Sequence, residues 1–253
     1  MPGLPRGAAA HPAPPTMARV RVRFAKRGRL RFLSHRDVAR AFERAVRRAG
    51  VPVSYSHGFS PHPRLSWVGA APTGAASEAE YVEIGLTEVM PTAELAAALD
   101  AALPAGLDIL DVVPVAPGSG SLADRIDASS WRVELPGVQT PELAAAVEAL
   151  LAADAVTVQR GGRNGPRSVD VSAGLVSVRV GSESAECAIL ELVVRQATPA
   201  VRPDDVLGAL GVVAGLRPPV PAKATRVAQG LLDDLGRLAD DPLERDRAAV
   251  RQA

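Results

Sequence analysis

The segment RVRVRFAKRGRLRFLSHRDVARAFERAVRRAG, residues 19–50, decides the fold of the chain. Its first six residues alternate strictly between arginine and an apolar side chain, which predicts a half-buried strand over residues 19–24. Ser34, followed three residues later by Asp37, is typical of a capping box at the start of a helix. Apolar residues then recur at helical spacing as far as Gly50, so the segment predicts a strand, a short extended piece and an amphipathic helix.

The elements expected downstream complete a recognisable order. We expect extended structure at residues 51–54 and 65–68, a strand at 81–86, a helix at 91–103 and a closing strand at 107–115. The order β, α, β, β, α, β is that of a ferredoxin-like unit, in which both helices cover one face of an antiparallel sheet.

The same order of elements is expected a second time. We predict strands at 131–135, 156–159, 188–195 and 225–230, one or two more strands within 169–180, and helices at 141–152 and 203–210. The sequence therefore predicts an α+β protein of tandem ferredoxin-like (βαββαβ) domains with antiparallel sheets.

Composition sets the expected boundaries between these units. Five prolines and the absence of an apolar pattern predict a disordered N-terminal arm over residues 1–16. We expect the two domains at 17–116 and 129–232, joined by a linker at 117–128. Residues 233–253 are expected to form a charged, mildly helical tail, for which fraying is the simplest interpretation.

The composition also excludes several classes of protein. No apolar run approaches the roughly 18 to 20 residues that a membrane span needs. A single cysteine, Cys187, excludes an intramolecular disulfide and any metal cage built from several thiolates, and favours a cytoplasmic location. The phosphate-binding, dinucleotide-binding and nucleophile-elbow glycine motifs are absent from the sequence, and no cofactor is expected.

The net charge of +1 conceals a strong asymmetry along the chain. Residues 19–64 carry thirteen basic and two acidic side chains, a balance of +11. Residues 78–134 carry eleven acidic and two basic side chains, a balance of −9. Such a division indicates either a basic surface for a polyanion or two segments that neutralise each other in the fold.

Three motifs carry a resemblance to a known family. They are FLSHRD at residues 32–37, SHGFSPHPRLS at 56–66 and PTGAASEAEYVEI at 72–84. Together they resemble the bacterial radical SAM-linked domain family, whose function is unknown, over roughly residues 17–232. The strand followed by RFLSH and a helix is also similar, at the level of the fold, to the ferredoxin-like endoribonucleases that process CRISPR repeat RNA.

The resemblance implies a partner rather than a radical enzyme. Members of the family occur as separate chains or beside radical SAM proteins. A radical SAM cluster needs three cysteine thiolates, which Cys187 alone cannot supply. Any radical chemistry would therefore belong to a radical SAM protein acting in trans, to which this chain presents a substrate.

Three histidines are the candidate catalytic residues: His35, His57 and His62. They have three interpretations. Imidazoles titrate near neutral pH, so they could act as general acids or bases in RNA cleavage. Three of them could also hold a zinc ion with one open position. Alternatively, His35 is a hydrogen-bonded residue at the helix start, and the loop that carries the other two is rigid packing.

The basic helix offers a binding function. Its arginines recur along one stripe and could meet successive phosphates, while Phe59 or Tyr55 could stack on an unpaired base. The residues expected to contact nucleic acid are Arg36, Arg40, Arg44, Arg47, Phe59, Arg64 and Arg163. The alternatives are a solvated helix face, or pairing of these arginines with Glu80, Glu83 and Glu94.

These observations favour an RNA-binding accessory module that presents tRNA or rRNA to a separate radical SAM enzyme. An endoribonuclease or RNA-modifying enzyme that uses the histidines, and a protein-interaction adaptor, are the alternatives.

Overall fold

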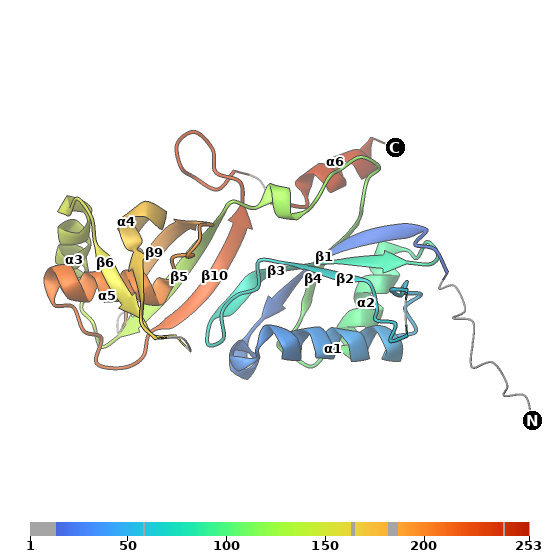
Figure 1. Cartoon of the computed structure of the whole chain (residues 1–253), viewed down its shortest axis with the longest axis horizontal. Helices are drawn as coiled ribbons and strands as arrows, with labels where there is room; N and C mark the ends of the chain where they lie inside the picture. The colour runs from blue at the N-terminus through green and yellow to red at the C-terminus, as the bar shows by residue number, and fades with distance from the viewer. Residues whose placement is uncertain (1–13, 58, 163–164, 182–186, 240, 253) are drawn as a thin grey trace, which may run out of the picture.

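The computed structural model describes residues 14–57, 59–162, 165–181, 187–239 and 241–252 of the chain. They form an α+β fold around one large, mostly antiparallel sheet of eight strands, which confirms the predicted class (Figure 1). No described helix is long and apolar enough to cross a membrane. Most of the predicted N-terminal arm lies outside the described residues.

The first half of the chain contains four strands and two α-helices. They are β1 (Ala18–Lys26), α1 (His35–Arg48), β2 (Leu65–Val68), β3 (Ala76–Leu86), α2 (Thr92–Ala102) and β4 (Ile109–Pro114). The strands lie in the order β4-β1-β3-β2, and all neighbours are antiparallel. Apolar side chains of β1, α1 and α2 share one core, so both helices cover the same face of the sheet.

Local sequence signals account for the start of this half. The alternation of β1 places Val20 and Val22 in the core beneath the helices. Ser34 caps α1, because its hydroxyl accepts from the backbone N–H of Asp37 and the Asp37 carboxylate accepts from the Ser34 backbone. The predicted capping box is therefore present.

Two short segments differ from the prediction. The stretch before α1 is not extended but a 3-10 helix, η1 (Gly28–Phe32). Residues 51–54 form no strand, and only an isolated bridge joins Val53 to Leu86. β2 already pairs with residues 81–84 of β3. This one strand between α1 and β3 therefore provides the backbone hydrogen bonds along that edge of β3.

The second half repeats this arrangement with an insertion. Its elements are β5 (Ala128–Pro136), α3 (Thr140–Ala152), β6 (Thr157–Arg160), β7 (Arg167–Asp170), α4 (Val171–Gly174), β8 (Leu175–Val180), β9 (Cys187–Arg195), α5 (Pro203–Ala214) and β10 (Lys223–Gly230). The strands of the large sheet lie in the order β10-β5-β9-β8, and β6 and β7 form a separate hairpin. Leaving that hairpin aside, the strands of both halves lie in the order fourth, first, third, second.

The two halves share one sheet, whereas the sequence predicted two. Parallel pairing of β10 with β3 aligns Thr225 with Ala76 and Arg226 with Ser77. The Arg226 side chain is buried, donates to the Ser77 hydroxyl at 3.2 Å and forms an ion pair with Glu80. These polar contacts join strands that local periodicity could not connect, since they lie about 150 residues apart in the chain.

Lys26 fixes a loop beside this junction. Its buried ammonium donates to the carbonyl oxygens of Ala71 and Pro72 at 3.2 and 3.3 Å. Glu80 accepts from the Ala71 backbone N–H at 3.1 Å. Burial lowers the pKa of Lys26, and the nearby carboxylate of Glu80 opposes that effect.

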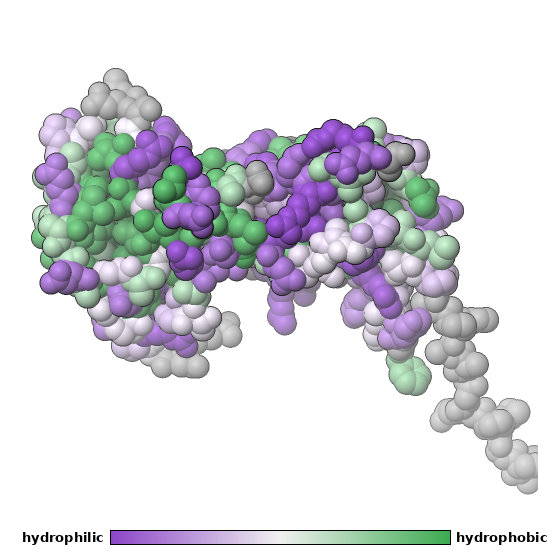
Figure 2. All heavy atoms as spheres, turned by 90° about the horizontal axis from the view of Figure 1, so that it is seen from above, coloured by the Kyte–Doolittle hydropathy of each residue, from purple (hydrophilic) through white to green (hydrophobic). Residues whose placement is uncertain are grey.

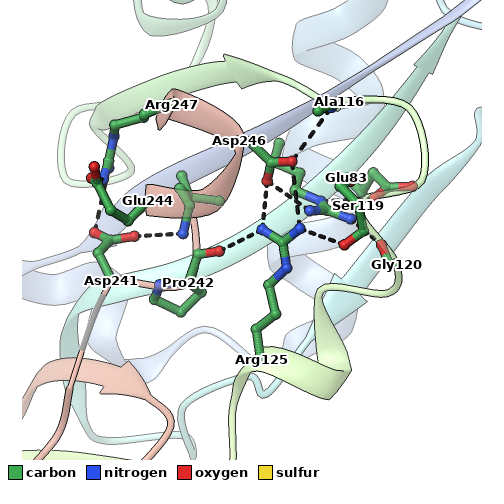
Figure 3. A network of polar contacts seen from close by, with 12 residues as sticks. Glu83, Ala116, Ser119, Gly120, Arg125, Asp241, Pro242, Glu244, Asp246 and Arg247 are labelled. Atoms are coloured by element: carbon green, nitrogen blue, oxygen red, sulfur yellow. Dashed lines mark hydrogen bonds and ion pairs between the residues drawn. The ribbon is translucent and has the colours of Figure 1, made fainter. Parts of the chain in front are cut away.

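The C-terminal segment is packed on the first half and is not a frayed tail. Helix α6 (Glu244–Arg251) lies on the opposite side of the sheet from α1, together with η2 (Ala123–Arg125) from the predicted linker (Figure 1). Asp246 is fully buried and forms ion pairs with Arg21 and Arg125, each at 2.7 Å (Figure 3). Arg21, on the polar side of β1, is also fully buried.

Further ion pairs surround this buried group. Arg23 pairs with Asp241 at 2.9 Å, and Arg247 pairs with Asp111 at 2.5 Å. On the side of the sheet that carries α6, hydrophilic side chains gather over the first half of the molecule and hydrophobic ones over the second (Figure 2). The arginines of β1 thus account for the docking of the C-terminal segment.

We expect Asp246→Asn to lower the free energy of unfolding by about 3 to 5 kcal/mol. Among the described residues it removes the only carboxylate paired with the buried Arg125, and it leaves the buried Arg21 with Glu83 alone. Urea denaturation at neutral pH measures this loss. Asp234→Asn is the matched control, since Asp234 is exposed and its side chain has no hydrogen bond to the described residues. An equal effect of both substitutions would show that the buried pair contributes nothing.

Acid should remove the same contribution. Burial alone would raise the pKa of Asp246, but hydrogen bonds from Arg21 and Arg125 hold it below its usual value. The stabilisation is therefore complete above the unfolded-state pKa of about 3.9 and is lost as the pH falls below it. The unfolding free energy of Asp246→Asn should fall less steeply below about pH 4 than that of the unmutated protein.

Candidate nucleic-acid interface

The arginines of β1, and Arg27 in the turn after it, are neutralised by carboxylates within the fold. Arg19 and Arg21 form ion pairs with Glu83 at 2.9 and 3.0 Å. Arg27 pairs with Glu78 at 2.5 Å and with Asp108 at 2.8 Å. In this part of the basic segment, the excess of arginine in the sequence is therefore balanced by carboxylates of the acidic segment that lie beside it in the fold.

The arginines of α1 are different. Arg36, Arg40, Arg44 and Arg47 are all exposed, and among the described residues their side chains have no ion pair or hydrogen bond. The proposed pairing with Glu80 and Glu83 is wrong, because these acids pair with Arg226 and with the β1 arginines. Glu94 forms no ion pair within the described ranges.

Packing fixes which side of α1 faces outward. Val38, Phe42 and Val46 are buried against the sheet. The Phe42 ring lies 4.7 Å from that of Phe24 and 5.2 Å from that of Trp67, measured between centroids. Because this aromatic cluster prevents the helix from turning about its axis, the arginine stripe points away from the core.

Two acids moderate the charge of the helix. Asp37 is occupied by the cap, where the hydrogen bond from Ser34 is the main reason that its pKa is lowered, with a smaller contribution from Arg40. Glu43 is half-buried. The outward face therefore remains strongly basic.

The three histidines do not form one site. His35 is exposed at the first position of α1, and its ring packs edge-on against Trp67 at 5.5 Å. His57 and His62 are exposed on the loop that follows the C-terminal end of α1 (Figure 1). They line none of the described cavities, and the described residues contain no group of three side chains that could hold a metal ion.

The loop that carries these histidines is closed by its backbone. A bridge pairs Tyr55 with Pro63, and the backbone N–H of His62 donates to the Ser56 hydroxyl at 3.0 Å. Phe59 is completely exposed, at 102% of its reference area. The alternative in which this loop is only packing predicts mostly buried Phe59, His57 and His62, and no pocket between the loop and His35. The three side chains are exposed, against the first expectation, but none of the described cavities joins the loop to the start of α1, in line with the second.

The remaining predicted contacts are dispersed. Arg64 is exposed, donates to the Tyr55 carbonyl at 3.3 Å and lines a cavity of about 550 Å³ together with Arg19 and Glu83. Arg163 lies outside the described residues. The structure thus places the four helix arginines on one surface, with Phe59 and Arg64 on the loop after it.

The family of the chain follows from its sequence over most of this region. Residues 19–203 match the family described as "Uncharacterized protein conserved in bacteria (DUF2344)". The chain belongs to this family. The match covers 185 of 253 residues, counted from 19 to 203 inclusive. No curated protein matches the chain.

The region that matches the DUF2344 family contains the arginine stripe of α1. It includes β1, α1 and the histidine loop, and it ends at the first residue of α5. The β10 strand and α6 therefore lie beyond the matched region, although both contact the first half of the fold.

Sequence reasoning missed a second group of cations. The structure brings Arg31 and Phe32 of η1 to a cavity that is also lined by Arg202 and Lys223. Arg31 and Phe32 lie within the segment 19–50, but nothing in the sequence near them indicates that Arg202, about 170 residues later, faces the same cavity.

We expect Ser34→Ala to lower the free energy of unfolding by about 1 kcal/mol, because it removes the side-chain cap of α1. Thermal unfolding measures the loss. Ser60→Ala is the matched control, since Ser60 is exposed and its side chain has no hydrogen bond to the described residues. No difference between the two variants would show that packing alone fixes the helix start.

Proposed function

We propose that this member of the DUF2344 family binds RNA through the arginine stripe of α1. The observation that carries the proposal is the contrast between two sets of arginines. Those of β1 are paired with carboxylates, whereas Arg36, Arg40, Arg44 and Arg47 are exposed without such partners among the described residues.

The geometry of the stripe suits a phosphate backbone. From Arg36 to Arg47 the helix advances about 16 Å, at 1.5 Å per residue. Guanidinium groups bind phosphate oxygens through two parallel hydrogen bonds and release the counterions condensed on the nucleic acid. Phe59, exposed on the neighbouring loop, supplies an aromatic surface for an unpaired base.

In the proposed role the chain is an accessory protein in the cytoplasm. Each half is a ferredoxin-like unit, and the chain presents tRNA or rRNA to a separate radical SAM enzyme. The resemblance of the three sequence motifs supports this partner, and the single cysteine places any radical cluster outside this chain.

Replacing Arg40 and Arg44 together with glutamine should weaken RNA binding while leaving the fold intact, since both side chains are exposed. The slope of log Kd against log salt should fall by roughly one for each phosphate that the variant no longer binds. Gel-shift titration with tRNA at several salt concentrations measures this, and the same gels show whether the RNA is cleaved.

Arg245→Gln is the matched control for this experiment. Arg245 is exposed on α6, across the sheet from α1, so its replacement should leave the affinity and the slope unchanged. A salt-independent affinity of the unmutated protein, or equal effects of both variants, would contradict the proposal.

A further inference from the structure

A cleft lies between the two halves of the molecule, beside the start of α1. One cavity of about 420 Å³ is lined by η1, the loop at residues 72–75, the start of α5 and the start of β10. A second cavity of about 310 Å³ lies against β5, β9 and β10. Pro72 and Arg202 line both, so the two cavities adjoin.

The cleft is lined by an excess of positive charge. Its basic residues are Arg31, Arg195, Arg202, Lys223 and Arg226, and its one acidic residue within the described chain is Asp204. Glu80 neutralises Arg226. The side chains of Arg202 and Lys223 are exposed and have no ion pair among the described residues. The lining thus fits an anionic ligand.

An exposed aromatic ring stands at the same cleft. Phe32 is 65% exposed although it is the last residue of η1 and lies two residues before the cap of α1. The guanidinium carbon of Arg31 lies 5.5 Å from the centre of its ring. Since Arg31 is itself held by the Gly74 carbonyl at 2.5 Å, the ring is presented in a supported position with most of its surface free.

This combination is one that recognises unpaired nucleotides. An aromatic face stacks on any base that is free of its duplex, while flanking cations hold the phosphates. Bases inside a duplex are stacked on each other and cannot reach a side chain in this way. A protein surface of cations alone would not make that distinction.

We propose that the cleft binds unpaired nucleotides of the same RNA that α1 holds, so that the protein prefers single-stranded RNA to a duplex. This inference rests on the proposed function. Because η1 directly precedes α1, the strand passes from the arginine stripe across Phe32 to Arg202 and Lys223.

Fluorescence anisotropy tests the preference with two probes. One is a fluorescein-labelled RNA of about 16 nucleotides without self-complementarity, and the other is the same strand annealed to its complement. The unmutated protein should bind the single strand more tightly. Phe32→Ala should weaken that binding roughly 5- to 150-fold and change duplex binding little, since stacking requires a free base.

A double variant examines the cations separately. Replacing Arg202 and Lys223 with glutamine should reduce the salt slope for the single strand by about 1.4, at roughly 0.7 for each phosphate contact. Arg245→Gln is again the control. Thermal unfolding confirms that each variant is folded, which the exposure of all three side chains leads us to expect.

The outcomes separate the two proposals. Equal affinity for both probes, with no effect of Phe32→Ala and no effect of the double variant, overturns the inference about the cleft but leaves binding by α1 standing. Failure of the unmutated protein to bind either probe overturns the proposed function itself.

Discussion

The buried carboxylate of Asp246 holds Arg21 and Arg125 together and thereby determines how the first half of the protein is covered. Arginines on a sheet face that lies beneath other chain must be paired, because an unpaired buried charge costs several kcal/mol. The C-terminal segment supplies the pairing acids, including Asp241. Glu83, Asp241 and Asp246 thus pair with the β1 arginines, whereas no ion pair among the described residues reaches the arginine stripe of α1 on the other side of the sheet.

The junction between the halves has a similar dependence on side chains. Only two residue pairs join β10 to β3, so backbone hydrogen bonding alone is a slight connection. Arg226, bound to Ser77 and Glu80, adds buried polar contacts across the same seam. A seam fixed in this way holds Lys223, at the start of β10, opposite η1, which two domains on a flexible linker would not do.

Much of the local order was predictable from the sequence because it depends on neighbours within one turn or one strand, although η1 and residues 51–54 were not. The alternation of residues 19–24, the cap at Ser34 and the exposed stripe of α1 are examples. The docking of Asp246 was not predictable, since Arg21 lies 225 residues away and charge totals do not assign partners. The cleft was not predictable for the same reason, because its basic residues come from both halves of the chain.

The composition of α1 also bears on its role. Arg36, Arg40 and Arg44 follow one another at a spacing of four, where like charges destabilise an isolated helix by about 0.2 to 0.5 kcal/mol per pair. The cap at Ser34 and the packing of Phe42 offset that repulsion, but neither removes it. A bound polyanion would remove it. Repulsion within the stripe therefore links the stability of the helix to the binding of a polyanion on its outer face. A face that only contacts solvent would gain no stability in this way.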